Sequence, residues 1–296
     1  MDTSALQAFI AVAQSGSFSR AGEQLGLTQP AVSKRIALLE AQLGSTLFDR
    51  FRKRIALNEA GRALLPYART VLQDLDEACR AVADLEGQVR GSLAIAFSHH
   101  IGLHRLPPYL QAFSRRFPEV RLDIAFVDSE QGYARVQQGH SELALVTLAP
   151  GFNADTDTTP LWPDPLVFVC SPQHELHLSE NVSLQQLAEL DAILPSTGTY
   201  TGRIVHDTFS KQRLTLKGTM TTNYLETIKM MVSIGLGWSV LPRTMTAGLE
   251  IIPVADTYLQ RELGLIQHRS RTLSNAGSAF KSLLLEDASA TGTGAS

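Results

Sequence analysis

Residues 17–36 constrain the fold of this chain more than any other segment, because they read as two short helices joined by a tight turn. In the first stretch Phe18, Ala21 and Leu25 recur at spacings of three and four residues, which gives a helix one apolar face. Gly26 follows, and glycine readily takes the left-handed conformation that ends a helix. The pattern therefore predicts a short amphipathic helix that stops at a sharp turn.

A second helix is predicted directly after the turn. Thr28 can cap it, and Pro30 is tolerated near its start because first-turn amides have no intrahelical partners. Its inward positions are Val32, Ile36 and Leu39, and its outward polar positions are Gln29, Ser33, Lys34 and Arg35. Two short helices joined in this way, with polar side chains outside the second, form the helix-turn-helix arrangement that places a recognition helix in the major groove of DNA.

A basic hairpin is predicted behind the second helix. Residues 47–50 read as a strand, residues 51–54 as its tip and residues 55–57 as the return strand. The cations at and beside the tip are Arg50, Arg52, Lys53 and Arg54. Such side chains beside DNA phosphates contribute affinity that is independent of sequence and sensitive to salt. A short basic run is more often a solvated turn, but its position after a helix-turn-helix favours a DNA contact.

The distribution of charge indicates a nucleic-acid module attached to a different kind of domain. The net charge is −3 over 296 residues, yet cations outnumber acidic residues between Ser17 and Asn58. That length suffices for about two or three domains with their own cores. No apolar run approaches the roughly 20 residues that span a bilayer, and the N-terminus lacks the features of an export signal. We therefore expect a cytoplasmic protein without a membrane partner.

A long helix is predicted to follow the hairpin. Asn58 can cap a helix that starts at Glu59 and runs to about Gln88, a length of ~45 Å at ~1.5 Å per residue. Its apolar stripe consists of Leu64, Ala68, Val71, Leu75, Cys79, Val82 and Leu85. Such a rod can pair with its copy in a second chain, so that two recognition helices meet two half-sites. The alternative is that the stripe packs only against its own chain.

From Gly91 onwards the pattern changes to strands that alternate with helices. The first part contains strands at 92–97, 120–127 and 143–147, with helices around 108–117 and 131–138. This order indicates a parallel sheet with helices on both faces. Residues 152–165 are rich in Asp, Thr and Pro, so we expect a loop that crosses to a second unit.

A second α/β unit follows that loop. Its predicted elements are strands at 166–170, 192–194 and 238–241 and helices at 184–190, 202–212 and 224–234. A strand near 262–267 and a helix around 276–285 can then return to complete the first unit. Two lobes joined by two crossings enclose a cleft, on which strand ends and helix N-termini converge. Residues 287–296 have little to bury, and we expect a disordered tail.

At this point the chain resembles a known family. The matching N-terminal residues are Leu6, Phe9, Val12, Ser17, Phe18, Ala21, Leu25, Gln29, Pro30, Ala31, Val32 and Ser33, then Ile36, Leu39, Glu40, Leu43, Gly44, Leu47, Phe48, Arg50, Leu57 and Gly61. Residues 235–242, Gly-Leu-Gly-Trp-Ser-Val-Leu-Pro, are similar to the family's Gly-x-Gly…Leu-Pro segment. With these residues the chain resembles a LysR-type transcriptional regulator over its length, apart from the C-terminal tail. Glu142, where the family often has Asp, and the pair His99-His100 depart from the pattern.

The resemblance implies a fold class and domain boundaries. A winged helix-turn-helix DNA-binding domain would occupy residues 1–58, and a linker or dimerisation helix residues 59–90. An effector-binding regulatory domain would occupy residues 91–286, with lobe I at about 91–160 and 265–286 and lobe II at about 161–264. The expected fold is therefore α/β with an N-terminal all-α winged helix-turn-helix, a long linker helix and two Rossmann-like lobes of the periplasmic-binding-protein type.

The resemblance also implies a sequence-specific DNA-binding regulator of transcription, modulated by a small molecule bound between the lobes. Candidate DNA contacts are Ser19, Arg20, Thr28, Gln29, Pro30, Ser33, Lys34, Arg35, Arg52, Lys53 and Arg54. Gln29 can read adenine edges and Ser33 can serve a base or a phosphate, whereas Lys34 and its neighbour Arg35 suit phosphates or guanine. Expected partners are double-stranded DNA, a second copy of the chain through the linker helix, and a homotetramer, with RNA polymerase as a further candidate.

Polar side chains at strand ends and helix starts are predicted to line the cleft. Candidate effector-binding residues are Ser98, His99, His100, Thr147, Ser196, Thr197, Thr199, Tyr200 and Asn223. Hydroxyls and free amides at helix N-termini bind anions, and many effectors of the family carry a carboxylate or another anionic group. Each hydroxyl is equally suited to a helix cap or a turn bond.

Two other hypotheses for these residues are weaker. A metal ion needs three or four ligands, and no Cys, Asp or Glu near His99, His100 and His104 in the sequence completes a site, so we expect no metal and no cofactor besides the effector. An enzyme or a cytoplasmic small-molecule receptor could be built on such lobes. However, no Gly-rich phosphate loop, nucleophile elbow or pair of catalytic acids follows a strand, and a receptor has no need of the N-terminal module. We therefore expect no enzymatic activity.

Overall fold

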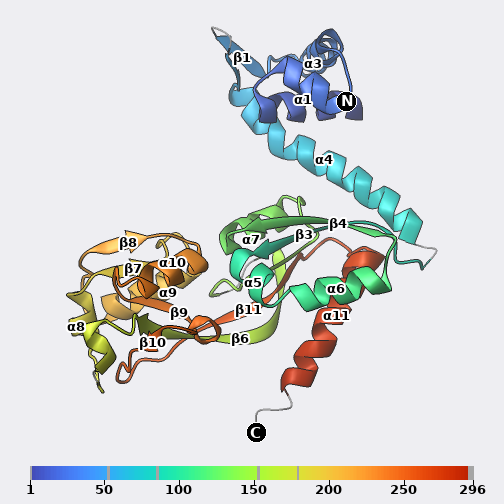
Figure 1. Ribbon diagram of the computed structural model, residues 1–296. Coiled ribbons are helices and arrows are strands. Elements are labelled where there is room, and N and C mark those ends of the chain that lie inside the picture. Colours follow the sequence, from blue (N-terminus) through green and yellow to red (C-terminus); the bar gives the residue numbers. More distant parts are fainter. Residues whose placement is uncertain (1, 52–53, 85–86, 152–153, 179, 293–296) are drawn as a thin grey trace. The chain divides into compact units, whose positions relative to one another are not determined.

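The computed structural model describes residues 2–51, 54–84, 87–151, 154–178 and 180–292. The chain divides into two compact units, Met1–Glu86 and Gly87–Ser296 (Figure 1). The boundary lies close to the predicted start of the regulatory domain. The first unit holds the helix-turn-helix and the second holds the α/β lobes.

The N-terminal unit is helical with one hairpin. Its elements are α1 (Thr3–Ser15), α2 (Phe18–Leu25), α3 (Gln29–Leu43), β1 (Phe48–Phe51), β2 (Arg54–Leu57) and α4 (Glu59–Asp84). The core positions predicted for the recognition helix, Val32, Ile36 and Leu39, are fully buried. Gly26 ends α2 with φ of 65°, in the left-handed region where glycine carries no side-chain penalty.

Two details of this unit differ from the predictions. Thr28 stands at the N-cap position of α3, but its side chain makes no capping hydrogen bond there, so the expected cap is wrong. The hairpin pairs Phe48 with Leu57 and Phe51 with Arg54, which moves each strand by about one residue from its predicted bounds. The predicted tip residues Arg52 and Lys53 lie outside the described residues, as does Leu85 of the apolar stripe.

The C-terminal unit is built on a seven-stranded sheet in the order β10-β6-β11-β5-β3-β4, with β9 also paired to β6. In lobe I, β3 (Gly91–Ser98) pairs in parallel with β4 (Val120–Val127) and β5 (Leu143–Thr147), which confirms the predicted parallel start. The helices of this lobe are α5 (His99–His104), α6 (Pro107–Arg116), α7 (Ser129–Gln137) and α11 (Asn275–Gly292). Buried apolar side chains between these layers, among them Phe97, Phe113 and Phe280, form its core.

Lobe II holds a second set of α/β elements around Trp238. They are η1 (Glu175–Leu178), α8 (Leu184–Ala188), β7 (Ala192–Leu194), α9 (Tyr200–Lys211), β8 (Thr219–Thr221), α10 (Leu225–Ser233), β9 (Ser239–Pro242), η2 (Arg243–Met245) and β10 (Glu250–Ile251). Trp238 is fully buried and packs on Phe168 and Phe209. Its indole Nε1 donates a hydrogen bond of 2.9 Å to the Leu187 carbonyl, so its polar atom is satisfied inside the core.

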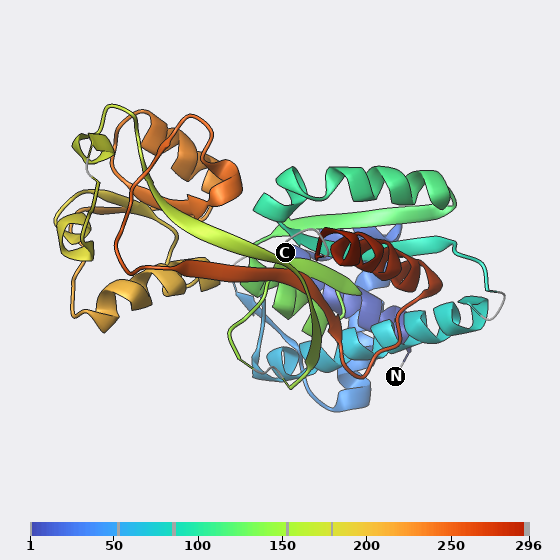
Figure 2. The same ribbon diagram turned by 90° about the horizontal axis from the view of Figure 1, so that it is seen from below.

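Two long antiparallel strands connect the lobes, and a loop was expected for the first of these crossings. β6 (Thr156–Cys170) pairs with β11 (Leu259–His268) from Leu166 opposite Leu259 to Thr156 opposite His268. Figure 2 shows both strands running from one lobe to the other. The prediction of a loop over 152–165 is therefore wrong from Thr156 onwards, and residues 152–153 lie outside the described residues. Both crossings between the lobes are strands.

The C-terminal helix is longer than expected. α11 continues to Gly292, so the predicted disorder of the tail is wrong for residues 287–292, and residues 293–296 lie outside the described part. Among the described residues, no helix combines the length and the apolar character that crossing a bilayer requires.

Candidate functional site

The outer face of α3 carries polar side chains over a buried apolar face. Gln29 and Lys34 are exposed, and Ser33 and Arg35 are half-buried. Gln29 Nε2 donates a hydrogen bond of 3.0 Å to Ser33 Oγ, one helical turn along. Because the opposite face of α3 is locked into the core, these four side chains are held on one outward surface. Their role in DNA contact stays a prediction.

The remaining predicted DNA contacts lie on neighbouring segments. Ser19 and Arg20 are exposed on α2, and Thr28 and Pro30 are exposed at the start of α3. Arg54 is the first residue of β2. The exposed positions at the start of α2 and α3 leave their polar groups accessible to a ligand from outside the unit.

A small cavity lies between the two lobes of the C-terminal unit. Its volume is about 50 Å³. Predicted effector residues that line it are Ser98, His99, His100, Thr147, Thr199, Tyr200 and Asn223, whereas Ser196 and Thr197 are not among its lining residues. Lining residues that the sequence did not indicate include Asp128, Ser129, Glu130, Thr201 and Arg261. A water needs about 10–15 Å³ of such space, so the cavity holds a few waters and not a metabolite.

Hydrogen bonds between the lobes close this cavity. Asn223 Nδ2 of lobe II donates to Asp128 Oδ2 of lobe I at 3.1 Å. The backbone N–H of Tyr200, in the first turn of α9, donates to Glu130 Oε1. Thr199 caps the same helix by accepting a bond of 3.0 Å from the Gly202 N–H. The helix N-terminus that was expected to bind an anion therefore holds the protein's own carboxylate, that of Glu130.

A buried ion pair lies where β6 and β11 pass between the lobes. Arg261 Nε donates to Asp164 Oδ2 at 2.8 Å, and the two side chains are 5% and 1% exposed. Arg261 Nη1 donates to Thr201 Oγ1 at 2.7 Å, which ties the strand to α9. Among the described residues, Asp164 Oδ1 and Arg261 Nη2 have no hydrogen-bond partner. The burial of Arg261 could have been predicted from the alternation of side chains along β11, which puts it on the same face as Leu259 and Leu263.

The histidines at the start of α5 have different surroundings. Burial, followed by the charges of Arg261, His104 and Arg105, lowers the pKa of His100 to about 3, so its imidazole is neutral at neutral pH. Its Nε2 lies 3.8 Å from Asp164 Oδ2, which is too long for a hydrogen bond. His99 instead packs against the Tyr224 ring.

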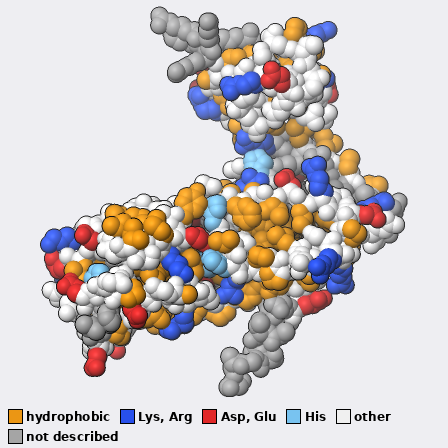
Figure 3. Space-filling model, viewed as in Figure 1, with side chains coloured by type: hydrophobic (Ala, Val, Ile, Leu, Met, Phe, Trp, Pro, Cys, Tyr) orange, Lys and Arg blue, Asp and Glu red, His pale blue; other side chains and the backbone are white. Residues whose placement is uncertain are grey.

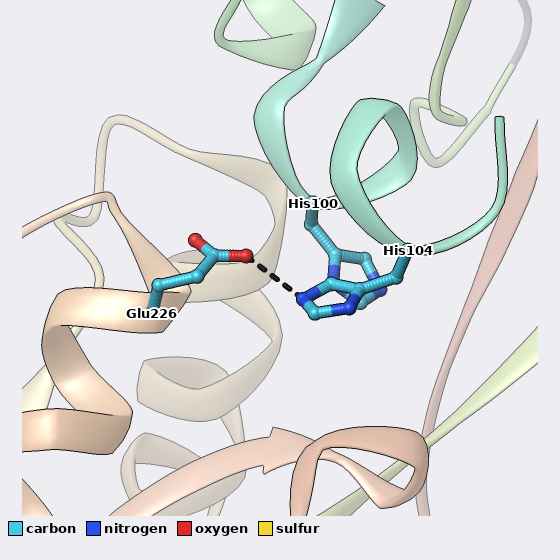
Figure 4. Close-up of side chains that lie close together, drawn as sticks. All are labelled: His100, His104 and Glu226. Atoms are coloured by element: carbon cyan, nitrogen blue, oxygen red, sulfur yellow. Dashed lines mark hydrogen bonds and ion pairs between the residues drawn. The ribbon is translucent and has the colours of Figure 1, made fainter. Parts of the chain in front are cut away.

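His104 reaches across to lobe II. Its Nε2 lies 3.1 Å from Glu226 Oε1 on α10, as Figure 4 shows. The expectation that no metal binds was based on the absence of a carboxylate near these histidines in the sequence. The fold supplies one from a position 122 residues away, which no local pattern could indicate.

Comparison with known proteins identifies two domains in this order. Residues 3–62 match the family model of the "Bacterial regulatory helix-turn-helix protein, lysR family", and residues 86–289 match the "LysR substrate binding domain". The HTH-type transcriptional regulator CfxR of Cupriavidus necator is 33% identical over 291 residues, covering 95% of this chain and 90% of that regulator.

Solved structures agree in fold. Full-length OxyR from Pseudomonas aeruginosa is similar with a TM-score of 0.70 at 22% identity, over 97% of this chain and 94% of that one. Full-length CbnR in complex with its target DNA gives a TM-score of 0.68 at 20% identity, over 97% of this chain and 99% of that one. The helix-turn-helix family match and the regulator CfxR confirm the expectation of a DNA-binding transcriptional regulator that is not an enzyme. The substrate-binding-domain match covers more than half of the sequence, and the chain therefore belongs to the LysR family of bacterial transcriptional regulators.

Proposed function

We propose that this regulator reads double-stranded DNA with α3 and responds to a small molecule that enters the cleft between its lobes. The observation that carries the DNA part is the outward polar face of α3, which stands on fully buried Val32, Ile36 and Leu39. A helix anchored so firmly presents its side chains to a groove with little loss of conformational entropy. Acting on DNA places the protein in the cytoplasm.

The predicted DNA contacts divide into base readers and phosphate contacts in this proposal. Gln29 reads an adenine edge, and Ser33, its hydrogen-bond partner, holds the amide in place or contacts a base itself. Lys34 and Arg35 bind phosphates or guanine, and Arg20 with Ser19 approaches the backbone. The hairpin residues Arg52, Lys53 and Arg54 supply the salt-dependent phosphate contacts.

Dimerisation through α4 brings two such helices together. Leu64 and Leu72 of this helix pack on the core of the N-terminal unit. Val71, Leu75 and Val82 are 41%, 45% and 69% exposed. Apolar side chains at that spacing lie along one stretch of the helix surface and are suited to a copy of the same helix. A homodimer formed this way can assemble further into a tetramer and contact RNA polymerase.

The effector is proposed to be a small carboxylate that takes the place of Glu130 at the start of α9. A site that already holds a carboxylate against a helix N-terminus has the donors that a carboxylate ligand needs. The cavity of about 50 Å³ must enlarge, because pockets for small molecules measure about 300–1,000 Å³. Entry of the effector therefore breaks the bonds of Asp128 and Glu130 to lobe II, and this change in lobe separation carries the signal.

The DNA part is tested with the full-length chain and a random double-stranded library. Sequences retained at low salt define a preferred site, and binding of Gln29→Ala and Gln42→Ala to that site is then measured by fluorescence anisotropy. Gln42 is an exposed glutamine at the other end of α3 and serves as the control. Gln29→Ala should lose discrimination at one base by about 1–3 kcal/mol, while Gln42→Ala should bind as the wild type does. Equal behaviour of both variants would refute the assignment of α3.

The effector part is tested by thermal shift of the full-length chain with a panel of small carboxylates. A carboxylate that raises the melting temperature of the wild type should act more weakly on Thr199→Val, because that variant loses the cap that fixes the first turn of α9. Glu130→Gln should respond at lower ligand concentrations, because it removes the competing charge. A Thr199→Val response equal to that of the wild type would contradict this placement.

A further inference from the structure

Three potential metal ligands from two lobes converge beside the cavity. His100 and His104 lie four residues apart on α5, so their side chains share one face of that helix. Glu226 comes from the first turn of α10 in lobe II. One ligand atom from each of the three residues lies within 4.8 Å of the others, and Figure 4 shows the carboxylate pointing toward the two rings.

His100 lacks the partners that a buried imidazole normally has. Its side chain is 7% exposed, and neither Nδ1 nor Nε2 has a hydrogen-bond partner among the described residues. Buried polar groups are nearly always paired, because an unpaired one costs the free energy of its lost hydration. A bound ion on one ring nitrogen would give this side chain the partner that the protein itself does not supply.

The ligand set has the chemistry of a known class of metal site. Two imidazoles and one carboxylate are the protein ligands of many zinc sites that keep a fourth position open. A tetrahedral ion with ligands at about 2.1 Å spaces them about 3.4 Å apart, so the longer separations in this cluster, at most 4.8 Å, must shrink by up to about 1.4 Å. His104 and Glu226 are already 3.1 Å apart, and their side chains are 39% and 35% exposed, so both can rotate toward the buried His100.

The charges around the three residues do not oppose a cation. Asp164 Oδ2 lies 3.8 Å from His100 Nε2, so a small shift of the ring would form the supporting carboxylate–histidine bond that orients metal-bound imidazoles. Two guanidinium groups are near, but both face this same carboxylate, Arg261 at 2.8 Å and Arg105 at 3.7 Å. The charges of these two guanidinium groups are balanced by the carboxylates of Asp164 and Glu226, so no net positive charge opposes a divalent ion.

We propose that His100, His104 and Glu226 bind a divalent transition-metal ion of the zinc class and that this ion clamps α5 of lobe I to α10 of lobe II. The ion replaces the direct bond between His104 and Glu226 with two stronger bonds to itself, and it recruits His100 as the third ligand. Three protein ligands leave one coordination position for a water or an anion. Figure 3 shows histidine side chains at the surface where the lobes meet, so an ion has access from solvent. Metal occupancy then resists separation of the lobes.

The test uses the full-length chain without a histidine tag, stripped with a chelator and dialysed. Cobalt(II) is titrated in, because its visible absorption reports tetrahedral binding, and zinc(II) is then used to displace it. The variants are Glu226→Gln and His104→Gln, which change half-exposed side chains and so spare the core. His206→Gln on α9 is the control, since His206 is also half-buried and is no part of the cluster.

The proposal predicts one tetrahedral cobalt ion per chain in the wild type and in His206→Gln, displaced by zinc. Each ligand variant should bind at least about tenfold more weakly, because even loss of a residue that supports a ligand costs about 10–100-fold in affinity. Zinc should also raise the melting temperature of the wild type and not that of Glu226→Gln. The proposal is overturned if the wild type gives no tetrahedral spectrum, or if both ligand variants bind as it does. In either case His104 and Glu226 form an inter-lobe hydrogen bond only.

Discussion

The buried pair of Asp164 and Arg261 allows a quantitative test of how the lobes are joined. Asp164→Asn keeps the shape of the side chain and removes its charge, which leaves the Arg261 guanidinium buried without a counter-charge. Breaking a buried pair in this way costs about 3–5 kcal/mol of the free energy of unfolding, because the remaining ion stays out of water. For a unit of this size, about 2–4 °C of melting temperature is lost per kcal/mol, so the variant should melt about 6–20 °C lower.

The chain contains its own control for this experiment. Arg269 Nε lies 2.8 Å from Asp157 Oδ1, the same distance as in the buried pair, and Asp157 also lies on β6. That pair is 42% and 50% exposed, so water and salt screen it. Exposed pairs contribute about 0–1 kcal/mol, and Asp157→Asn should therefore change the melting temperature by no more than about 4 °C. The two pairs have the same residue types and the same distance and differ in burial, so a difference between their melting-temperature shifts reports the effect of burial.

Tryptophan fluorescence is the appropriate signal. The chain has 2 tryptophans, Trp162 and Trp238, and both lie in the C-terminal unit, so the transition reports that unit without a contribution from the helix-turn-helix. A double variant, Asp164→Leu with Arg261→Met, should recover most of the loss, because apolar replacement of a buried pair is often neutral or stabilising. Equal small shifts for Asp164→Asn and Asp157→Asn would refute the reasoning, since burial would then not determine the cost.

Single residues on α4, on α5 and at two helix starts allow further tests. Leu75→Arg puts a charge into the exposed stripe of α4 and should shift the sedimentation of the full-length protein from dimer toward monomer, whereas an unchanged dimer would place the interface elsewhere. In the presence of a chelator, the wild type should lose about 2 kcal/mol of its free energy of unfolding between pH 7 and pH 5, relative to His100→Gln. The reason is that burial lowers the pKa of His100 to about 3 in the folded state, so the stability present above the unfolded pKa is lost as the pH falls toward that value. Equal changes for the two proteins in fluorescence-detected denaturation at both pH values would contradict this prediction. Asn58→Ala should cost about 1 kcal/mol by circular dichroism, because Asn58 Oδ1 accepts the Gly61 N–H at 2.9 Å, and Thr28→Ala should cost almost nothing because Thr28 makes no such bond.

The helix-turn-helix could be predicted in detail because its determinants are local. Phe18 and Ala21 are buried at helical spacing, and Gly26 ends α2 in the left-handed conformation, as the pattern indicated. An N-cap hydrogen bond cannot be predicted from the residue type alone, because the side-chain rotamer decides whether the bond forms. Ser17 accepts the Arg20 N–H at 3.4 Å, whereas Thr28 at the next helix start does not bond.

The first part of β6, up to Pro165, was mistaken for a loop because of its prolines. Proline cannot donate a ladder hydrogen bond, so it argues against a strand with two neighbours. Pro160, Pro163 and Pro165 all lie in the half of β6 that pairs with β11, whereas β9 and β10 pair only with residues from Leu166 onwards. The register also shifts between Leu263 and Gly264, opposite this half. Prolines are tolerated in such an edge segment, which the sequence cannot distinguish from a loop.

The cleft could be predicted only where it is made of strand ends and helix starts. Ser98, Thr147 and Thr199 were found because each occupies such a position, and all three line the cavity. The positions of Asp164 and Glu226 beside the cleft could not be predicted, because their partners Arg261 and His104 lie far away in the sequence. That His100 and His104 share one helix face could not be predicted either, because α5 is a six-residue helix that no local pattern indicated.

The charge inside the cleft depends on one register. Arg261 stands opposite Asp164 in the ladder between β11 and β6, and both side chains face the interior. Side chains alternate between the two faces of a strand, so a slip of one residue would turn Arg261 to solvent and bring Gln260 or Glu262 inward. The buried carboxylate of Asp164 would then lose its cation, and Thr201 its hydrogen-bond donor from β11. The pairing of these two crossing strands therefore specifies the lobe connection and the electrostatics of the cleft together, and selection for either one constrains the other.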